Sequence, residues 1–319
     1  MIDSSEISVV VQGPVYKDVT PKCLDSIRRA LPRAEIILST WEGADVSELG
    51  DKYDQLLLNP DPGGFPLIKN ENRKNNINRQ IVSSRNGIKK ATRKFCLKYR
   101  SDFELKDDKF LSHFGKFPAR AEDWKILKER VLVNYATHPL FRAFHPTDIT
   151  CFGLTEDVLN MWDIPLADEE HLFYFERNPY PEIYHSPFGE QLIPRVGAEM
   201  YVWTSFLKKH GKINFRHNWD GTPENVHLTE LTIANNLQVL NREEFDFVPL
   251  LHPYLLGEDA RFSWMDEKLW EYYYKKHCVK NIPCSDLEFH IYYPLKLLKY
   301  HLRYSPRVPK ILRRIFKKI

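Results

Sequence analysis

The chain has 319 residues, of which 43% are hydrophobic and 28% are charged, and its formal net charge is +3. These values exclude a disordered protein and indicate a globular chain with enough interior for one large domain or two small ones. Five scattered cysteines without a C-x-x-C pair indicate neither a disulfide framework nor a zinc site, and they favour a reducing compartment. Because no secretory-type leader or membrane-length apolar stretch is visible, we expect a cytoplasmic protein.

The first sixty residues read as a strand, a helix and two further strands. Ile7 to Gln12 (ISVVVQ) is an apolar, β-branched run typical of a buried parallel strand, and Gly13-Pro14 ends it. Thr20-Pro21 predicts a helix start with Thr20 at the N-cap. Glu35 to Thr40 and Gln55 to Leu58 are predicted to be the second and third strands.

A helix and a strand are predicted between Asn75 and Glu104. The helix is indicated by apolar residues near helical spacing, and the strand that follows by apolar residues at every second position: Ile77, Ile81, Val82 and Ile88, then Phe95, Leu97 and Tyr99. Asp102 and Glu104 come at the end of this strand, where open α/β sheets place their ligand crevices. Such a pair can bind one Mn²⁺ or Mg²⁺ ion, whereas two solvated carboxylates in a charged loop are the alternative.

The second half of the chain offers two further acidic candidates. Asp148 precedes a short apolar stretch and a helix that is predicted to start at Thr155. Glu199 lies in a predicted helix from Arg195 to His210. Asp148 is a candidate general base or acceptor ligand, and Glu199 is a second candidate catalytic residue that could reach the site. A loop-capping Asp148 and a core-facing helix around Glu199 are the alternatives. We also expect the segment from Lys109 to Arg120 to form a loop over the site.

The order of elements is typical of a doubly wound α/β domain. The residues after the first strand, QGPVYK, contain no G-x-G-x-x-G fingerprint and no Walker A loop, so a glycine-rich phosphate grip is excluded there. Histidines are dispersed without an H-E-x-x-H pair. We place a domain boundary near residue 255, with residues 1–255 as the catalytic domain and residues 256–319 as an aromatic, basic helical C-terminal extension.

The positive charge is concentrated at the C-terminal end. No Asp or Glu occurs from Phe289 to Ile319, and nine of the 46 basic residues follow from Lys296 onward. As a helix, the last eleven residues, PKILRRIFKKI, would have one apolar face and one basic face. This pattern is typical of a helix that lies on an anionic membrane. A helix docked on its own domain or on a partner and a nucleic-acid contact are the alternatives. We expect membrane contact and no nucleic-acid partner.

Four segments together carry a family resemblance: SVVVQGPVY, CLDSIRRALPRAEIILSTWEG, NINRQIVSSRNGIKKA and KFCLKYRSD, all between residues 7 and 104. In combination they resemble the WavE family of lipopolysaccharide-synthesis proteins, and the broader layout is similar to GT-A glycosyltransferases. The resemblance implies a Rossmann-like mixed sheet and transfer of a sugar from a nucleotide-activated donor to a surface glycan. It places Asp102 where a GT-A metal-binding aspartate would stand, although this chain has Arg-Ser-Asp-Phe-Glu where that family has Asp-x-Asp.

A set of candidate site residues follows from these positions. Asp102 and Glu104 could hold a metal, and Arg79 and Arg100 could act as cations beside it or in its place. Gln12 and Trp41 are placed to contact a nucleobase by hydrogen bonding and stacking. Lys98 is a charged residue within a strand, and a buried charge of this kind needs a partner. The predicted donor-binding set is Gln12, Gly13, Pro14, Trp41, Asn78, Arg79, Lys98, Arg100 and Asp102, and the predicted catalytic set is Asp148 and Glu199.

These expectations describe a glycosyltransferase attached peripherally to the inner face of the cell membrane, with a glycan or glycolipid acceptor. Two other functions stay open. A sugar nucleotidyltransferase shares the α/β layout, but it requires a glycine-rich triphosphate loop after the first strand, and QGPVYK is a poor match. A non-catalytic membrane-associated assembly protein would keep the basic tail and would not need Asp102.

Overall fold

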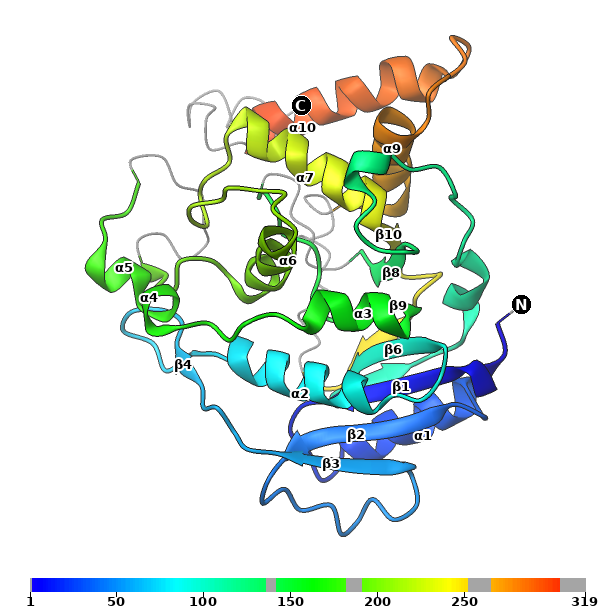
Figure 1. Cartoon of the computed structure of the whole chain (residues 1–319), viewed down its shortest axis with the longest axis vertical. Coiled ribbons are helices and arrows are strands. Elements are labelled where there is room, and N and C mark those ends of the chain that lie inside the picture. The colour runs from blue at the N-terminus through cyan, green and yellow to red at the C-terminus, as the bar shows by residue number, and fades with distance from the viewer. Residues whose placement is uncertain (1, 136–141, 182–190, 252–264, 305–319) are drawn as a thin grey trace.

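The computed structural model describes residues 2–135, 142–181, 191–251 and 265–304. Its centre is a mixed sheet of seven strands in the order β10-β8-β9-β6-β1-β2-β3 (Figure 1). The strands are β1 Ile7–Gln12, β2 Glu35–Trp41, β3 Gln55–Asn59, β6 Phe95–Arg100, β8 Val131–Asn134, β9 Cys151–Leu154 and β10 Leu237–Leu240. The predicted α/β fold with a mixed sheet is therefore confirmed.

Strand direction brings several polar strand ends to one edge of the sheet. β1 pairs in parallel with β2 on one side and with β6 on the other, and β2 pairs in parallel with β3. β9 runs antiparallel to both β6 and β8. Because the chain adds strands first on one side of β1 and then on the other, the carboxyl ends of β1 and β6 form a switch point, where α/β proteins bind ligands.

Helices cover both faces of the sheet. α1 (Thr20–Ala30) packs on one face, with the side chains of Val9 and Val11, and α2 (Ile77–Lys90) packs on the other, with Val10. The remaining helices are α3 Thr155–Trp162, α4 Glu169–Leu172, α5 Tyr174–Arg177, α6 Ala198–Lys209, α7 Pro223–Asn236, α9 Glu267–Cys278 and α10 Tyr293–Tyr304. α3, α6, α7 and α9 extend the core on the α2 face.

Short elements complete the description. Two small antiparallel pairs join β4 with β5 and β7 with β11. Their bounds, and those of the short 3-10 and π helices, are β4 Phe65–Pro66, β5 Lys74–Asn75, β7 Phe103–Leu105, β11 Phe247–Pro249, η1 Ser4–Glu6, η2 Lys109–His113, η3 Glu122–Trp124 and η6 Glu288–Tyr292.

The close contact between α2 and the sheet depends on Gly87. A Cβ atom at this position would lie 2.4 Å from Cγ1 of Val10 and 3.0 Å from Cβ of Ser39. Such distances are well inside van der Waals contact, so any other residue would push the helix away from β1 and β2. The missing side chain therefore sets how closely α2 approaches the end of the sheet where the predicted site lies.

Two local predictions need correction. Thr20 is the first residue of α1 and not its N-cap, because its Oγ1 accepts a hydrogen bond from the Tyr16 backbone N–H at 2.9 Å and so closes the preceding turn. The segment from Lys109 to Arg120 does not lie over the site. Phe114 packs edge-on against Phe95, and Phe117 packs against Trp270 of α9, so these aromatic residues anchor the segment elsewhere.

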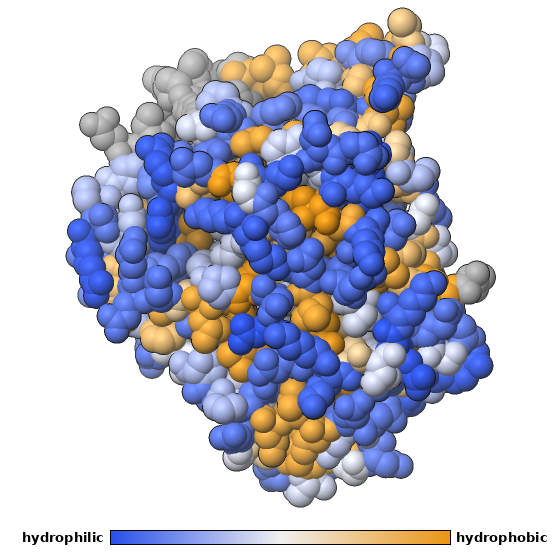
Figure 2. All heavy atoms as spheres, viewed as in Figure 1, coloured by the Kyte–Doolittle hydropathy of each residue, from blue (hydrophilic) through white to orange (hydrophobic). Residues whose placement is uncertain are grey.

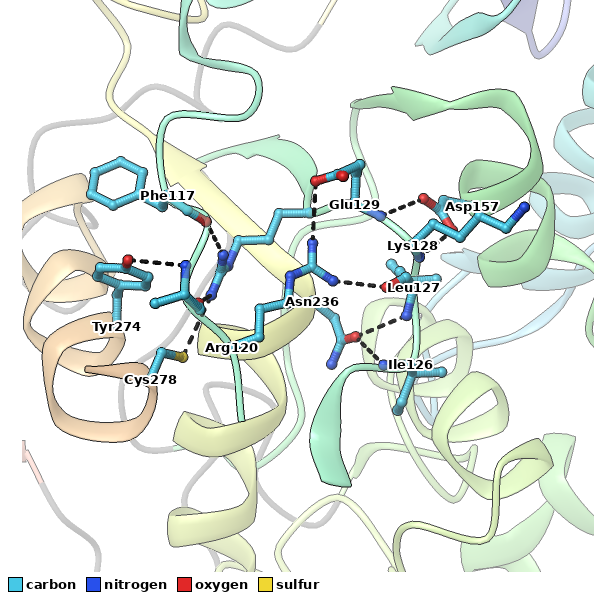
Figure 3. Close-up of polar contacts among 12 residues, drawn as sticks. Phe117, Arg120, Ile126, Leu127, Lys128, Glu129, Asp157, Asn236, Tyr274 and Cys278 are labelled. Atoms are coloured by element: carbon cyan, nitrogen blue, oxygen red, sulfur yellow. Dashed lines mark hydrogen bonds and ion pairs between the residues drawn. The ribbon is translucent and has the colours of Figure 1, made fainter. Parts of the chain in front are cut away.

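Polar side chains from three helices hold the segment before β8 in place (Figure 3). Asn236 at the end of α7 accepts hydrogen bonds from the backbone N–H groups of Ile126 and Leu127, at 2.9 and 3.1 Å. Asp157 of α3 accepts from the N–H groups of Lys128 and Glu129, at 2.8 and 2.9 Å. These side chains satisfy backbone N–H groups that regular secondary structure would otherwise pair, and they fix the position of the chain just before β8.

The aromatic segment beyond residue 255 joins the main core. Leu269, Trp270 and Tyr273 of α9 are buried in the same cluster as residues of α2, α3 and α6. The basic tail and most of the predicted closing segment from Leu250 to Arg261 lie outside the described residues, so the position of the boundary near 255 stays a prediction. Within the described part of the chain, no helix combines the length and apolar character needed to cross a membrane.

Candidate active site

A pocket of about 330 Å³ opens beside the carboxyl end of β6. The β4–β5 hairpin, the first turn of α2, the end of β6, the segment from residue 142 to 149 and the start of α6 line it, together with Leu192 and Asn218. Its polar and charged lining includes Lys74, Asn75, Asn76, Gln80, Arg100, Arg142, His145, Asp148, Glu199 and Asn218. The pocket therefore brings together three residues of the predicted site, Arg100, Asp148 and Glu199, from segments that are far apart in the sequence.

Arg100 and Asp102 form a two-pronged ion pair at the end of β6. Nε of Arg100 donates to Oδ1 of Asp102 at 2.9 Å, and Nη2 donates to Oδ2 at 2.7 Å. The Asp102 side chain is only 4% exposed, whereas that of Arg100 is 25% exposed and reaches the pocket wall. Burial lowers the pKa of Arg100, but the hydrogen bonds and charge of Asp102 outweigh it and the pKa is raised. Arg100 is thus a permanent, fixed cation.

The loop after β1 is fastened to the same strand end. Gly13 has a φ of 124°, and a Cβ atom there would lie 2.9 Å from Oγ of Ser101. That hydroxyl donates to the carbonyl of Pro14 at 2.7 Å. Gln12 is buried and accepts a hydrogen bond from Ser83 of α2 at 2.9 Å. Only glycine satisfies both the positive φ and the close contact, so Gly13 allows this loop to lie beside Arg100.

Asp148 and Glu199 are the two carboxylates of the pocket. Burial raises the pKa of Asp148, and the neighbouring charge of Glu199 raises it further. Burial also raises the pKa of Glu199, whose Oε2 lies 3.9 Å from Nε2 of His145. Burial lowers the pKa of Arg142, and the nearby charge of Glu199 acts in the opposite direction. The pocket thus holds acid groups whose proton affinity is shifted toward neutral pH, as general acid–base catalysis requires.

Lys98 supports the segment that carries Asp148. Its fully buried ammonium donates to the backbone carbonyls of Asp148, at 2.5 Å, and Ile149, at 3.3 Å. It also lies 4.4 Å from the ring centroid of Trp162. Burial lowers the pKa of Lys98 to about 8. The partners that a buried strand cation requires are therefore two backbone oxygens and an aromatic ring.

The raised pKa of Glu199 makes a testable prediction about pH. Because the folded protein binds the Glu199 proton more tightly than the unfolded chain does, this proton stabilises the fold at low pH. The contribution to the free energy of unfolding is complete below the ordinary pKa of 4.5 and is lost as pH rises through the higher pKa of the folded state. We therefore expect Glu199→Gln to raise the free energy of unfolding by about 1 kcal/mol at pH 7. The gain should shrink as pH falls toward 4.5, in urea titrations at several pH values. Glu170→Gln is the control, because that side chain is 75% exposed.

Several predicted site residues lie elsewhere or have structural partners. Asn78 exchanges hydrogen bonds with the backbone of Ala167, at 2.7 and 3.0 Å, and so joins α2 to the segment before α4. Arg79 forms a two-pronged ion pair with Asp61, at 2.7 and 2.6 Å. Trp41 ends β2, on the same sheet edge as Gln12 but outside the pocket lining. None of these three contacts Arg100 among the described residues.

Glu104 is the predicted metal ligand with the least suitable surroundings. It lies on β7, and its two oxygens meet Arg29 of α1 at 3.3 Å and Lys106 at 2.9 Å. In the described part of the chain, the one group of three possible metal ligands with closely spaced atoms is His227, Glu230 and His277. That group joins α7 to α9, and the Glu230 oxygen nearest His277 is already bound by Lys276 at 2.6 Å.

Other pocket residues were not predicted from the sequence. Asn75 and Gln80 each bury a polar atom, Nδ2 and Oε1 respectively, that has no hydrogen-bond partner among the described residues. Both side chains also line the pocket. Arg142 and His145 stand in a segment without regular structure, where the sequence shows no periodicity that would have singled them out.

Comparison with known proteins assigns the chain to a family. A family model described as WavE lipopolysaccharide synthesis matches residues 7–302. The chain belongs to the WavE lipopolysaccharide synthesis family. Four sequence segments indicated this membership. In the structure of this WavE protein they fall on β1, α1, β2, α2 and β6 and on the loops directly after the strands. A search of curated proteins by sequence finds no match.

Solved structures show only distant likeness to this WavE protein. TarS from S. aureus is 11% identical, with a TM-score of 0.30, over 96% of this chain and 50% of that one. The 4-diphosphocytidyl-2C-methyl-D-erythritol synthase from Anaerococcus prevotii is 13% identical, with a TM-score of 0.29, over 65% of this chain and all of that one. HddC from Yersinia pseudotuberculosis is 11% identical, with a TM-score of 0.27, over 59% and 87% of the two chains.

Proposed function

We propose that this WavE protein is a glycosyltransferase with a GT-A-like donor site, which moves a sugar from a nucleotide-activated donor to a lipid-linked or lipopolysaccharide glycan. The observation that carries the proposal is that one pocket, beside the carboxyl end of β6, contains the fixed cation Arg100 and two carboxylates of raised pKa. Membership of a lipopolysaccharide synthesis family supports it.

The pocket residues suit the two charge changes of sugar transfer. As the acceptor oxygen bonds to the sugar carbon, the acceptor hydroxyl loses its proton to a base, and we assign this role to Asp148 with Glu199 beside it. The bond from the sugar carbon to the donor phosphate breaks at the same time, and the phosphate leaves with more negative charge. Arg100 and Arg142, which line the pocket together with Lys74, are the cations that we assign to receive it.

We place the nucleoside of the donor along the edge of the sheet next to the pocket. Gln12 and Trp41 end β1 and β2 there, and the loop after Gln12 is joined to the residue next to Arg100 by the hydrogen bond from Ser101 to the Pro14 carbonyl. Trp41 offers a ring for stacking, and loops at this edge are where doubly wound sheets bind nucleotides. Asn78 and Arg79 then support the site from α2 and do not contact the donor.

A panel of nucleotides and nucleotide sugars tests the proposal against its rivals. We expect at least one nucleotide sugar to raise the melting temperature of the protein and to be slowly hydrolysed. Stabilisation by a nucleoside triphosphate with formation of a nucleotide sugar would instead identify a sugar nucleotidyltransferase. A protein that responds to neither class would be a non-catalytic assembly component.

The last described helix supports attachment to a membrane. Leu287, Ile291, Leu295 and Leu298 recur at helical spacing along η6 and α10, and their exposed fractions are 64%, 52%, 59% and 52%. Figure 2 shows apolar side chains at the surface near α10, at the top of the view. Because no acidic residue follows Glu288, we assign this apolar stripe and the basic tail to the anionic inner face of the cell membrane.

Vesicle sedimentation tests this membrane assignment. The double variant Leu295→Glu, Leu298→Glu should bind vesicles of phosphatidylglycerol and phosphatidylcholine about tenfold less than the wild type, because it puts charge into the interface. Leu58→Glu is the matched control, since Leu58 is 44% exposed on β3, at the opposite end of the molecule in Figure 1. Equal sedimentation of the double variant and the wild type would contradict the assignment.

A further inference from the structure

The carboxylates at the end of β6 do not fit a divalent cation. Mg²⁺ and Mn²⁺ require several oxygen ligands that no other cation already occupies. Both oxygens of Asp102 accept short hydrogen bonds from Arg100, and both oxygens of Glu104 face basic side chains. In the described residues, neither carboxylate belongs to a group of three closely spaced ligand atoms. A metal at Asp102 would have to displace the Arg100 guanidinium.

We propose that Arg100 does the work of the divalent cation of related sugar transfer sites, and that the protein binds the donor diphosphate without a metal. The inference rests on the proposed function, because it concerns the same site and the same donor. Asp102 is then a positioning residue, whose carboxylate fixes the plane of the guanidinium group and does not touch the substrate.

The geometry of Arg100 leaves one edge of the guanidinium group for a ligand. Nε and Nη2 are used by Asp102, whereas Nη1 makes no hydrogen bond to the described residues. Because Arg100 lines the pocket and Asp102 does not, we place the unused edge on the pocket side. A guanidinium can bind phosphate oxygens with parallel N–H groups while it keeps a second pair of bonds to a carboxylate.

The other cations of the region divide clearly into two groups. Arg142 and Lys74 line the same pocket and can share the charge of a diphosphate with Arg100. Arg79, which was an equal candidate from the sequence, is held by Asp61 and by Asn76, and it is absent from the pocket lining. The replacement cation is therefore Arg100 and not Arg79.

Burial makes this arrangement effective. Arg100 is three-quarters covered and Asp102 almost completely covered, so the ion pair is shielded from solvent and the guanidinium is held in one orientation. A charge fixed in a site of low dielectric stabilises a developing phosphate charge without reorganisation. Lysine could supply the charge at this position but not the two-pronged contact with Asp102.

The test is calorimetric titration of the full chain with nucleoside diphosphates, UDP, GDP, CDP and ADP, once with EDTA and once with MnCl₂. We expect one of them to bind with the same affinity under both conditions. Arg100→Lys should weaken that binding by about tenfold or more, since the parallel hydrogen bonds are lost. Asp102→Asn should weaken it less, and the double variant should show less than the sum of the two effects, because Asp102 acts through Arg100.

Glu104→Gln is the matched variant that separates the two explanations. If Glu104 were a metal ligand, this change would reduce binding in MnCl₂, whereas we expect no change in either buffer. Nucleotide binding that requires Mn²⁺, or that falls in Glu104→Gln, would overturn the inference and leave the proposed function standing. Binding of no nucleotide would overturn the proposed function itself. Circular dichroism of each variant confirms that a loss of binding is not a loss of fold.

Discussion

Replacement of Asp148 by asparagine should reduce the rate of sugar transfer by about 100- to 10,000-fold, because an amide cannot take the proton of the acceptor hydroxyl. The fold should persist, since the contact that holds this segment uses the backbone carbonyl of Asp148 and not its carboxylate. The measurement is kcat with the donor identified by the nucleotide-sugar panel, together with the melting temperature of the variant.

The pH dependence of transfer separates a base from a merely structural carboxylate. With Asp148 as the base, kcat should fall as pH drops through a pKa above the ordinary value of 3.8 for an aspartate, because burial and Glu199 raise it. Asp18→Asn is the control, since Asp18 is exposed in the loop after β1. Wild-type turnover by Asp148→Asn would remove Asp148 from the mechanism.

Replacement of Arg130 by methionine should lower the free energy of unfolding by about 3–5 kcal/mol. The buried guanidinium donates to the carbonyls of Ala234, at 2.8 Å, and Ala119, at 2.7 Å, and also to the carbonyl of Phe117. Methionine would remove the guanidinium donor from all three buried oxygens, and only that of Ala234 would keep a second contact, the weak one from the Cys278 thiol at 3.7 Å. Burial lowers the pKa of Arg130 to about 10, but the group remains charged at neutral pH.

Urea denaturation measures this effect, and two further variants define its cause. Arg130→Lys should recover only part of the loss, because an ammonium cannot reach three carbonyls with the same geometry. Arg33→Met should change stability by less than about 0.5 kcal/mol, since Arg33 is exposed on the surface. A loss in Arg130→Met no larger than that in Arg33→Met would show that the segment before β8 is held by other contacts.

The central strands could be predicted from the sequence because one physical signal dominates each. β1 and β2 are continuous apolar runs, and β6 alternates, with Lys98 as its one buried charge. The sequence did not predict where η3 ends and β8 begins. Between Glu122 and Tyr135 the chain is held by distant side chains such as Asn236 and Asp157, and such contacts leave no local pattern in the sequence.

The candidate site was predictable where it coincides with a strand end and not where tertiary contacts form it. Arg100 and Asp102 follow directly from the position of β6. Their mutual pairing did not, because spacing alone fits a shared metal as well as an ion pair with a cation two residues away. Arg142 and His145 reach the pocket through an irregular segment, which Lys98 holds at its Asp148 end, and neither residue type marks a site by itself.

The most direct test of this account is a crystal structure of the protein with its nucleotide sugar. We expect the diphosphate to accept hydrogen bonds from the Arg100 guanidinium, with the sugar carbon in the pocket facing Asp148. A nucleotide sugar bound away from Arg100, or with its sugar on the opposite side of the sheet from Asp148, would contradict the proposed site.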